Sequence, residues 1–279
     1  MLVDALKHKE KRLFDAIAET RSLIVAYSGG VDSAYLAHAA HRVLGDDTIA
    51  VTAQSASYPR SHFEMAERVA RECGFRHRLV ETREIENPEY AANPVNRCYF
   101  CKTELFDTLE GLRSELGIEA VAYGVNADDM GDYRPGQLAA EEHRVLAPLL
   151  DAGLSKAEIR ALSREAGLPT AGIPASACLS SRIPYGMEVT PEKLGQIDRG
   201  EDALRALGFR QVRVRHHGEL ARVEVASPEL PRALAPEMAA RVSAALKEVG
   251  FRWVSLDLDG YRTGSLNEVL EIQPPGPAR

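Results

Sequence analysis

The chain has 279 residues, of which 45% are hydrophobic and 27% charged, and its formal net charge is −7. This is the composition of a globular protein, with enough residues for one medium domain and a small one. No apolar run approaches the length that spans a bilayer, and the first residues pattern as a mixed-charge amphipathic helix, so we expect a cytoplasmic location and no membrane partner. The acidic balance argues against a nucleic-acid partner, because Lys and Arg supply most non-specific affinity.

Strand and helix patterns alternate through the first two thirds of the chain. An apolar run predicts a buried strand at 23–27, and helical spacing predicts a helix at 33–44. The alternation continues with strand 48–53, helix 61–73, strand 76–81, helix 102–116 and strand 119–124. We therefore predict an α/β fold with a doubly wound parallel sheet, whose ligands bind at the carboxyl ends of its strands.

A second, smaller α+β domain is predicted beyond an irregular stretch at 168–190 that is rich in proline and glycine. Its expected elements are helix 191–207, strands 211–217 and 220–226, helix 228–249 and strand 251–258. The two neighbouring strands meet at His217-Gly218 and are expected to form an antiparallel hairpin. We assign 1–175 to the first domain, 176–272 to the second domain and 273–279 to a disordered tail.

The turn between the first strand and the first helix of the sheet reads SGGVDS at 28–33. Gly29 and Gly30 allow the backbone to approach a ligand, and the N–H groups of the first helical turn attract an anion. Ser28 and Ser33 add hydroxyl donors, and Asp32 can hold a magnesium ion on phosphates. Helix capping alone is the simpler interpretation, but it does not need so many polar and glycine residues together. The turn therefore predicts phosphate binding.

Cysteines form a second feature, because four of them in a cytoplasmic chain favour metal, redox or catalytic use over disulfides. Cys98 and Cys101 are expected just before the helix at 102–116, and a CxxC turn can direct both sulfurs to one metal. Cys178 lies in a loop of small residues beside serine and arginine, which suits a reactive thiol. Cys73 is in register with a buried helical face and is expected to be a core thiol.

Three functional cysteines fit a 4Fe-4S cluster with one open iron better than structural zinc, which usually takes four protein ligands. Two alternatives stay open on the residues alone. One is a zinc site completed by a histidine such as His143, and the other is a simple dithiol.

Further candidates follow the predicted strands. Gly124 ends a strand where the backbone must pass close to the bound ligand, and Asp129 lies on the same rim, so we expect Asp32 with Asp129 to bind magnesium. Gln54 and Ser55 are expected to line the same ligand site if the sheet is doubly wound.

Paired arginines mark the second domain. Arg213 and Arg215 alternate with valines, so their guanidinium groups leave one face of a strand and could bind a phosphate or carboxylate. An exposed sheet face of mixed charge, with Glu224 as a cross-strand partner, is the interpretation that the residues alone favour.

The turn at 28–33 resembles the loop of the PP-loop ATP pyrophosphatases, whose members split ATP between the α and β phosphates. Longer segments resemble the LarE family of ATP-dependent sulfur transferases, which act in the biosynthesis of the nickel-pincer nucleotide of lactate racemase. The matching segments are AYSGGVDSAYLA at 26–37, GVNADDMGDYRPG at 124–136, PASACLSSRIPYG at 174–186, VRVRHHGELARVEV at 212–225 and GYRTGSLNE at 260–268.

The resemblance implies that ATP adenylates a carboxylate of a pyridinium dicarboxylate mononucleotide, which then becomes a thiocarboxylate. It implies magnesium as a cofactor, a sulfide donor and a homo-oligomer. It also makes 1–175 the ATP-binding domain and 176–272 the substrate and sulfur-transfer domain. The ligand beside Gly124 would then be a nucleotide, whose adenosine Gln54 and Ser55 would flank. Cys178 matches the sulfur-bearing cysteine of the family, and the additional Cys98 and Cys101 match the branch in which three cysteines hold a 4Fe-4S cluster. Members with Cys178 alone sacrifice its sulfur and keep dehydroalanine, which is the alternative mechanism.

The resemblance also concerns charged residues of the second domain. It implies that Arg213 and Arg215 bind the phosphate of the substrate, with Arg262 as a third candidate. Glu201 and Glu224 match acidic positions associated with a metal or the substrate site, although Glu201 could equally be a solvated charge on a helix. Three other functions remain as alternatives: a tRNA thiolase, an amide-forming ligase, and a nucleotide-binding regulatory module without chemistry.

Overall fold

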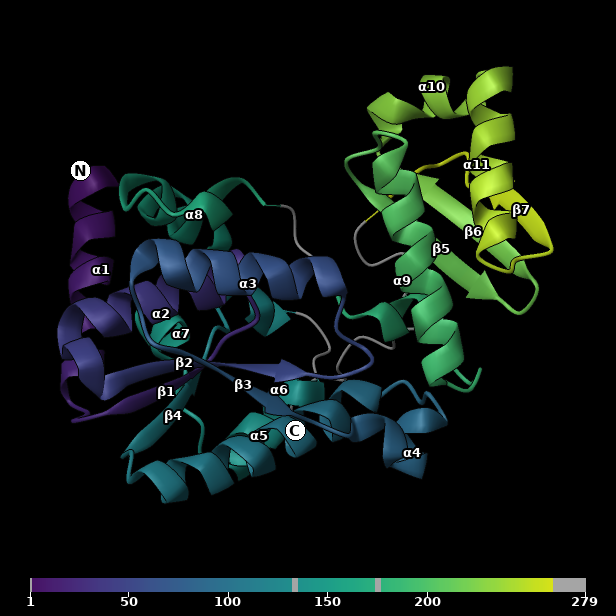
Figure 1. Ribbon diagram of the computed structural model, residues 1–279. Helices are drawn as coiled ribbons and strands as arrows, with labels where there is room; N and C mark the ends of the chain where they lie inside the picture. The colour runs from purple at the N-terminus through teal and green to yellow at the C-terminus, as the bar shows by residue number, and fades with distance from the viewer. Residues whose placement is uncertain (1, 132–134, 174–176, 263–279) are drawn as a thin grey trace, which may run out of the picture. The chain divides into compact units, whose positions relative to one another are not determined.

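The computed structural model describes residues 2–131, 135–173 and 177–262. The chain divides into two compact units, Met1–Ala177 and Cys178–Arg279, which are labelled by element in Figure 1. The tail predicted at 273–279 lies outside the described residues. The predicted assignment of one function to 1–175 and another to 176–272 stays a prediction.

A parallel four-stranded sheet forms the centre of the first unit. Its strands are β1 (Leu23–Ala26), β2 (Thr48–Gln54), β3 (His77–Glu81) and β4 (Ala120–Tyr123), in the order β3-β2-β1-β4. The chain moves outward from β1 to β3 and then returns to the other side of β1. This reversal leaves a crevice beyond the carboxyl ends of β1 and β4, where ligands of such sheets bind. The α/β fold class predicted from the alternation is confirmed.

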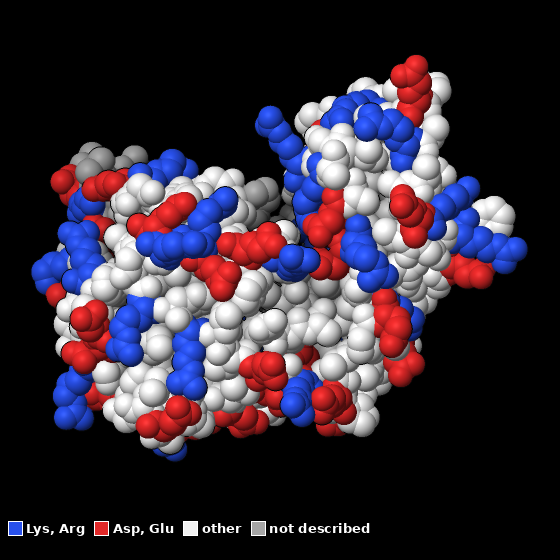
Figure 2. All heavy atoms as spheres, in the orientation of Figure 1, with Lys and Arg blue, Asp and Glu red and all other residues white. Residues whose placement is uncertain are grey.

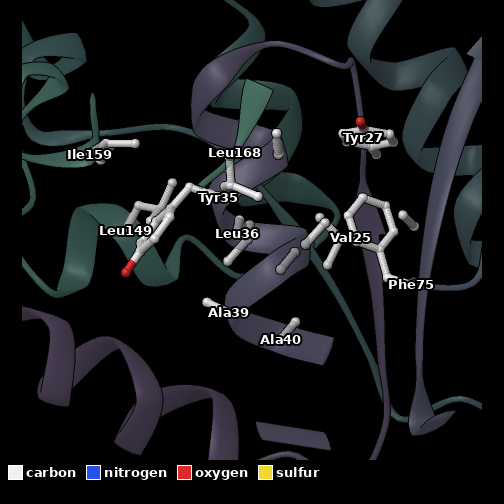
Figure 3. Packing of buried hydrophobic residues seen from close by; sticks show 14 of the residues in the cluster. Val25, Tyr27, Tyr35, Leu36, Ala39, Ala40, Phe75, Leu149, Ile159 and Leu168 are labelled. Carbon is white, nitrogen blue, oxygen red and sulfur yellow. The ribbon is translucent and has the colours of Figure 1, made fainter. Parts of the chain in front are cut away.

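Helices cover both faces of this sheet. Neighbouring residues of a strand point to opposite sides, so the apolar residues of β1 pack against helices on both faces. On one face Leu23 and Val25 pack in a cluster with helices α1 (Leu2–Ala18), α2 (Val31–Leu44), α3 (Arg60–Cys73), α7 (Pro148–Asp151) and α8 (Lys156–Glu165). Figure 3 shows Val25 and Leu36 within that cluster. On the other face Ile24 and Ala26 pack against α5 (Arg97–Leu116) and α6 (Pro135–Glu142).

Short elements connect these layers. They are the one-turn helix α4 (Pro88–Ala91) and the 3-10 turns η1 (Gly45–Asp47), η2 (Glu84–Glu86), η3 (Ala127–Gly131) and η4 (Pro169–Gly172). Helix α8 begins with a full capping box, in which Ser155 and Glu158 each bind the other's backbone N–H. This cap fixes the position of Lys156, the first residue of the helix.

The second unit has a three-stranded mixed sheet in the order β5-β6-β7. Strands β5 (Val212–His217) and β6 (Leu220–Val225) form the predicted antiparallel hairpin, and β7 (Trp253–Leu256) pairs parallel to β6. The other elements are η5 (Leu179–Arg182), α9 (Pro191–Ala206), η6 (Ser227–Glu229), α10 (Leu230–Leu234) and α11 (Pro236–Glu248). Apolar residues of α9, α11 and both hairpin strands share one core. The small α+β unit is therefore confirmed.

Two predicted helices are corrected. The helix expected at 228–249 is interrupted, because Ala235 is extended before Pro236, as residues preceding proline usually are. The helix expected at 102–116 begins at Arg97, so both cysteines of the CxxC sequence lie inside the helix, near its start. Within the part of the chain that the structure describes, no helix combines the length and the hydropathy needed to cross a membrane.

Candidate nucleotide site and cysteine segments

The loop of the first unit joins β1 to α2 at the carboxyl edge of the sheet. Helix α2 begins at Val31, two residues earlier than predicted, so Asp32 and Ser33 lie in its first turn. The backbone N–H of Ser28 donates to Ser33 Oγ at 3.1 Å, and the two hydroxyl oxygens are also 3.1 Å apart. The serines therefore hold each other at the helix N-terminus, where N–H groups and the helix dipole favour an anion.

Two glycines are required for this arrangement. Gly29 has a φ of +65°, a conformation that L side chains rarely adopt, and a Cβ there would lie 3.0 Å from Cβ of Ala66 on α3. Gly124 follows β4, and a Cβ there would lie 2.8 Å from the backbone nitrogen of Ser33. The chain leaving β4 therefore passes directly over the first turn of α2. This close packing explains why position 124 needs a glycine, in addition to the predicted approach of its backbone to a nucleotide.

Asp32 is paired with a residue that sequence reasoning missed. Lys156 Nζ donates to Asp32 Oδ2, and the backbone N–H of Lys156 donates to Asp128 Oδ2 at 2.9 Å. Asp32 Oδ1 is buried and has no hydrogen-bond partner among the described residues. The only sequence signal for Lys156 is its place directly after the cap Ser155, which says nothing about the distant loop.

Burial raises the pKa of the Asp32 carboxyl, although the hydrogen bond and charge of Lys156 act in the opposite direction. The carboxylate of Asp129 raises this pKa further, as expected when two acidic groups share one rim. Asp129 itself accepts a hydrogen bond from the backbone N–H of Asn126 at 3.0 Å. A partly buried carboxylate with one unsatisfied oxygen, close to a second carboxylate, fits a magnesium ion, which prefers oxygen ligands.

Gln54 and Ser55 lie at the carboxyl end of β2, as predicted, and they line a hollow of about 330 Å³. The lining residues are Gln54, Ser55, Ala56, Glu81, Thr82 and Arg83. Next to it, Ser57 donates to the buried Glu84 at 2.6 Å, and the hydroxyl oxygens of Ser55 and Ser57 are 3.0 Å apart. The hollow therefore has polar surroundings at the ends of β2 and β3.

Cys98 is exposed and Cys101 half-buried, and their spacing of three residues places them on one face of α5. Cys73 is half-buried against the core of the first unit, and burial raises the pKa of its thiol. His143 lies 3.8 Å from Asp107. Over residues 2–131, 135–173 and 177–262, no three His, Cys, Asp or Glu side chains are grouped so that they could hold a metal ion.

Cys178 belongs to the second unit, where it caps η5 and is half-buried. Its carbonyl oxygen accepts three hydrogen bonds: from the backbone N–H of Ser181 at 3.1 Å, from Ser181 Oγ at 2.7 Å and from Arg182 Nη1 at 2.8 Å. The backbone next to the sulfur-bearing side chain is therefore fixed by its own loop.

Glu201 and Glu224 are both paired with arginines. Arg182 donates to both oxygens of Glu201 at 2.8 and 3.1 Å, and both side chains are fully buried. Arg215 donates to both oxygens of Glu224 at 2.8 Å. Glu201 is thus no solvated charge, and Arg215 and Glu224 form a buried pair instead of lying on an exposed sheet face. A role of both glutamates at a metal or substrate site stays a prediction.

Arg213 and Arg262 have different surroundings. The Arg213 guanidinium lies over the ring of Tyr261, 4.9 Å from its centroid, and donates to the carbonyl of Val212 at 2.7 Å. Arg262 is half-exposed and pairs with Asp259 at 3.4 Å.

On the face of the first unit seen in Figure 2, basic and acidic side chains are interspersed, so the described part of that face carries no continuous basic surface.

Comparison with known proteins gives three informative relatives, while no family model matches the chain. It is 34% identical over 269 residues to the pyridinium-3,5-bisthiocarboxylic acid mononucleotide synthase of Lactiplantibacillus plantarum, covering 95% of this chain and 96% of the relative. It is 45% identical over 265 residues to an uncharacterized protein of Synechocystis, covering 95% and 99%. It is 24% identical over 217 residues to one component of the glutamine-hydrolyzing GMP synthase of Pyrococcus furiosus, covering 68% and 64%.

A parallel sheet whose first strand runs through an SGGVDS loop into a helix defines a PP-loop protein, and the similarity to a GMP synthase agrees with this class. Identity of 34% over nearly the whole length of a synthase narrows the class to one family of enzymes. The chain belongs to the LarE family, that of the pyridinium-3,5-bisthiocarboxylic acid mononucleotide synthases.

Proposed function

We propose that the chain is an ATP-dependent sulfur transferase that adenylates a carboxylate of a pyridinium dicarboxylate mononucleotide and converts it to a thiocarboxylate, a step of nickel-pincer nucleotide biosynthesis. The observation that carries the proposal is the alignment with the L. plantarum synthase over 95% of the chain. Support from the structure is the anion-binding loop at the N-terminus of α2, with a buried carboxylate beside it.

In this proposal ATP binds along the carboxyl edge of the first sheet. Gln54 and Ser55 flank the adenosine in the hollow beyond β2, while Ser28, Gly29, Gly30 and Ser33 hold the β and γ phosphates. Asp32 and Asp129 would hold magnesium, which when bound neutralises charge on the phosphates. Lys156 donates to Asp32 in the structure and would donate to the phosphates instead if Asp32 held magnesium, since its ammonium would then need another anion.

Chemistry then proceeds by two displacements. A substrate carboxylate oxygen attacks the α-phosphorus of ATP, the bond to the bridging oxygen breaks, and pyrophosphate departs on the N-terminus of α2. A sulfur nucleophile next attacks the acyl carbon, and AMP leaves with the oxygen that the carboxylate contributed. Arg213 and Arg262 are proposed to bind the phosphate of the substrate nucleotide, because guanidinium groups bind phosphates by paired hydrogen bonds. Arg215, the remaining predicted candidate, already donates to both oxygens of Glu224 and to the carbonyl oxygen of Ser181, so it is left out of this role.

Two sources of sulfur are compatible with the chain. Cys98, Cys101 and Cys178 would hold a 4Fe-4S cluster, which when loaded by a sulfide donor supplies sulfide to the activated carboxylate. Cys98 and Cys101 share one face of α5 and so fit two ligands of one centre. The second source is the sulfur of Cys178 itself, given up once with dehydroalanine left behind. This route needs no other cysteine.

The proposal is tested by incubating the full chain with ATP, magnesium and the pyridinium dicarboxylate mononucleotide, and by measuring pyrophosphate and AMP. Release that depends on the dicarboxylate supports adenylation. If neither this substrate nor other carboxylates cause release, the regulatory module is favoured. Amide formation with ammonia would favour the ligase. Salt-dependent binding of tRNA would favour the thiolase.

Anaerobic reconstitution separates the two sulfur sources. About four iron atoms per chain are expected for a cubane, and substitution of Cys98 or Cys101 by serine should abolish the loading. The substitution Cys73→Ala is the matched control and should leave it intact, because Cys73 packs against the core. If iron does not load, and mass spectrometry after turnover shows that Cys178 has lost hydrogen sulfide, the sacrificial mechanism replaces the cluster.

A further inference from the structure

Two arginines of the second unit hold the loop of Cys178 in the same manner. We define the Cys178 segment as residues 178–182. Arg182 uses Nε and Nη2 on the carboxylate of Glu201, and its Nη1 donates to the carbonyl oxygen of Cys178 at 2.8 Å. Arg215 uses the same two nitrogens on Glu224, and its Nη1 donates to the carbonyl oxygen of Ser181 at 2.8 Å.

These carboxylates belong to rigid elements of the fold. Glu201 lies in α9 and also accepts hydrogen bonds from the backbone N–H of Val214 in β5 and from Arg205 at 2.9 Å. Glu224 lies in β6, paired with β5, which carries Arg215. The side chains of Arg182 and Glu201 are 0% exposed, and those of Arg215 and Glu224 are 7% and 1% exposed. Each arginine–glutamate pair therefore ties the Cys178 segment to the helix and sheet of its own unit.

A guanidinium group is suited to this task. It presents its donors in a rigid plane, so one edge can bind a carboxylate while the remaining nitrogen binds a carbonyl. A lysine ammonium is a point charge and cannot keep all three contacts in this geometry. Both guanidinium groups use two nitrogens on glutamate and the third on the backbone of the segment.

We propose that Arg182 and Arg215, each fixed by its buried glutamate, are positioning residues that set the location of the Cys178 thiol. The contact runs through the backbone, because Arg182 holds the carbonyl group bonded to the Cα that carries the thiol. Glu201 and Glu224 act on the thiol only through these arginines, by orienting the planes of the guanidinium groups. This inference rests on the proposed function for its consequence in sulfur transfer, but its geometric content can be measured without turnover.

Iron-free full-length protein is used for the test, and the rates of alkylation of Cys178 and Cys98 by iodoacetamide are measured by peptide mass spectrometry. The main variant is Arg182→Met with Glu201→Gln, which removes both charges of the buried pair together and keeps an amide oxygen for Val214. Such replacement of a buried pair is often tolerated, whereas removal of one partner is strongly destabilising. Ser181→Ala is a milder second variant, which removes one hydrogen bond to the Cys178 carbonyl and the hydroxyl oxygen that accepts from Arg182 Nη1 at 2.9 Å.

Arg205→Lys is the matched control, because Arg205 also pairs with Glu201 but directs its other end to Asp202 at 2.6 Å instead of the Cys178 segment. In the main variant we expect faster alkylation of Cys178, unchanged alkylation of Cys98 and an unchanged circular dichroism spectrum. Single-turnover sulfur transfer should fall by about 100-fold, the cost that a displacement of ~1 Å can have. The control should match the wild type in every measurement.

Folded main and Ser181→Ala variants with wild-type alkylation of Cys178 and wild-type transfer would overturn the positioning role. If the main variant unfolds, the Ser181→Ala comparison decides alone. If the wild type itself transfers no sulfur, the proposed function fails, and the alkylation rates still show whether the Arg182–Glu201 pair positions the thiol. The two failures are thereby distinguished.

Discussion

Lys156 Nζ donates a hydrogen bond to Asp32 Oδ2, although the two residues are 124 positions apart in the chain. Asp32 stands in the first turn of α2, and Lys156 is the first residue of α8. The contact places a cation at the loop proposed to hold phosphates. It gives the site a lysine that the SGGVDS motif does not contain.

Replacement of Lys156 by methionine should weaken ATP binding by about tenfold or more, since a hydrogen bond to a charged group contributes ~1.5–3 kcal/mol. Equilibrium titration with ATP and magnesium measures the effect. Lys9→Met is the control, because Lys9 pairs with Glu158 of the same helix α8 at 2.8 Å and not with the loop. Equal ATP affinities for the Lys156 variant and the wild type would remove this lysine from the site.

Replacement of Gly124 by alanine should destabilise the first unit and weaken nucleotide binding. The new Cβ would meet the backbone nitrogen of Ser33 at 2.8 Å, and backbone cannot move aside as a flexible side chain can. Overpacking of this kind costs about 1–3 kcal/mol. Gly111→Ala is the control, because Gly111 lies in α5 with open space around it, and alanine there should stabilise the helix by about 1 kcal/mol. Melting temperatures that shift in the same direction for both variants would contradict this.

Replacement of Glu201 alone by glutamine should lower the free energy of unfolding by about 3–5 kcal/mol, because the Arg182 charge is left buried without its partner. Urea denaturation measures the change. Glu219→Gln is the matched control, since Glu219 pairs with Arg252 on the surface, and about 0.5 kcal/mol or less is expected there. A small loss at position 201 would mean that the pair contributes little.

The same pair predicts an acid dependence of stability. Burial alone would raise the pKa of Glu201, but Arg182, Arg213 and Arg205 together hold it below its ordinary value. A lowered carboxyl pKa gives stability that is present above the unfolded pKa of about 4.3 and is lost as the pH falls through the folded pKa. The unfolding free energy of the wild type should therefore drop below about pH 4, and more steeply than that of the Glu201→Gln variant.

Magnesium-dependent ATP binding should weaken as the pH is lowered, and at a higher pH than an ordinary aspartate would require. Burial raises the pKa of Asp32, and a carboxyl must lose its proton before it can hold a cation. Because the pKa of Asp32 is higher in the folded than in the unfolded state, protonation of this carboxyl stabilises the fold. That contribution to the unfolding free energy is lost as the pH rises through the folded pKa. Titrations at several pH values test this. The Asp32→Asn variant should bind weakly with no such dependence, and an identical pH profile would contradict the role of Asp32.

Local sequence was sufficient for much of the fold. The strands at 23–27 and 48–53 were expected within one residue at each end, because buried parallel strands are short apolar runs. Helix ends were less well predicted. Helix α5 starts at Arg97 although Asn96 makes no side-chain cap there, and the helix expected at 228–249 breaks before Pro236. Backbone hydrogen bonds from Arg97 to Pro94 and from Tyr99 to Asn96 form the turn at the start of α5, and no capping side chain marks this turn in the sequence.

The sequence by itself determined the SGGVDS loop, since its serines, glycines and aspartate lie within six residues and the contacts between its serines are local. It also identified the family, because matching segments need no spatial information. Only the tertiary structure decided which distant charges meet: Lys156 on Asp32, Arg182 on Glu201 and Arg215 on Glu224. A charged residue carries no local sign of its partner, because the sheet order and the helix packing bring the two together.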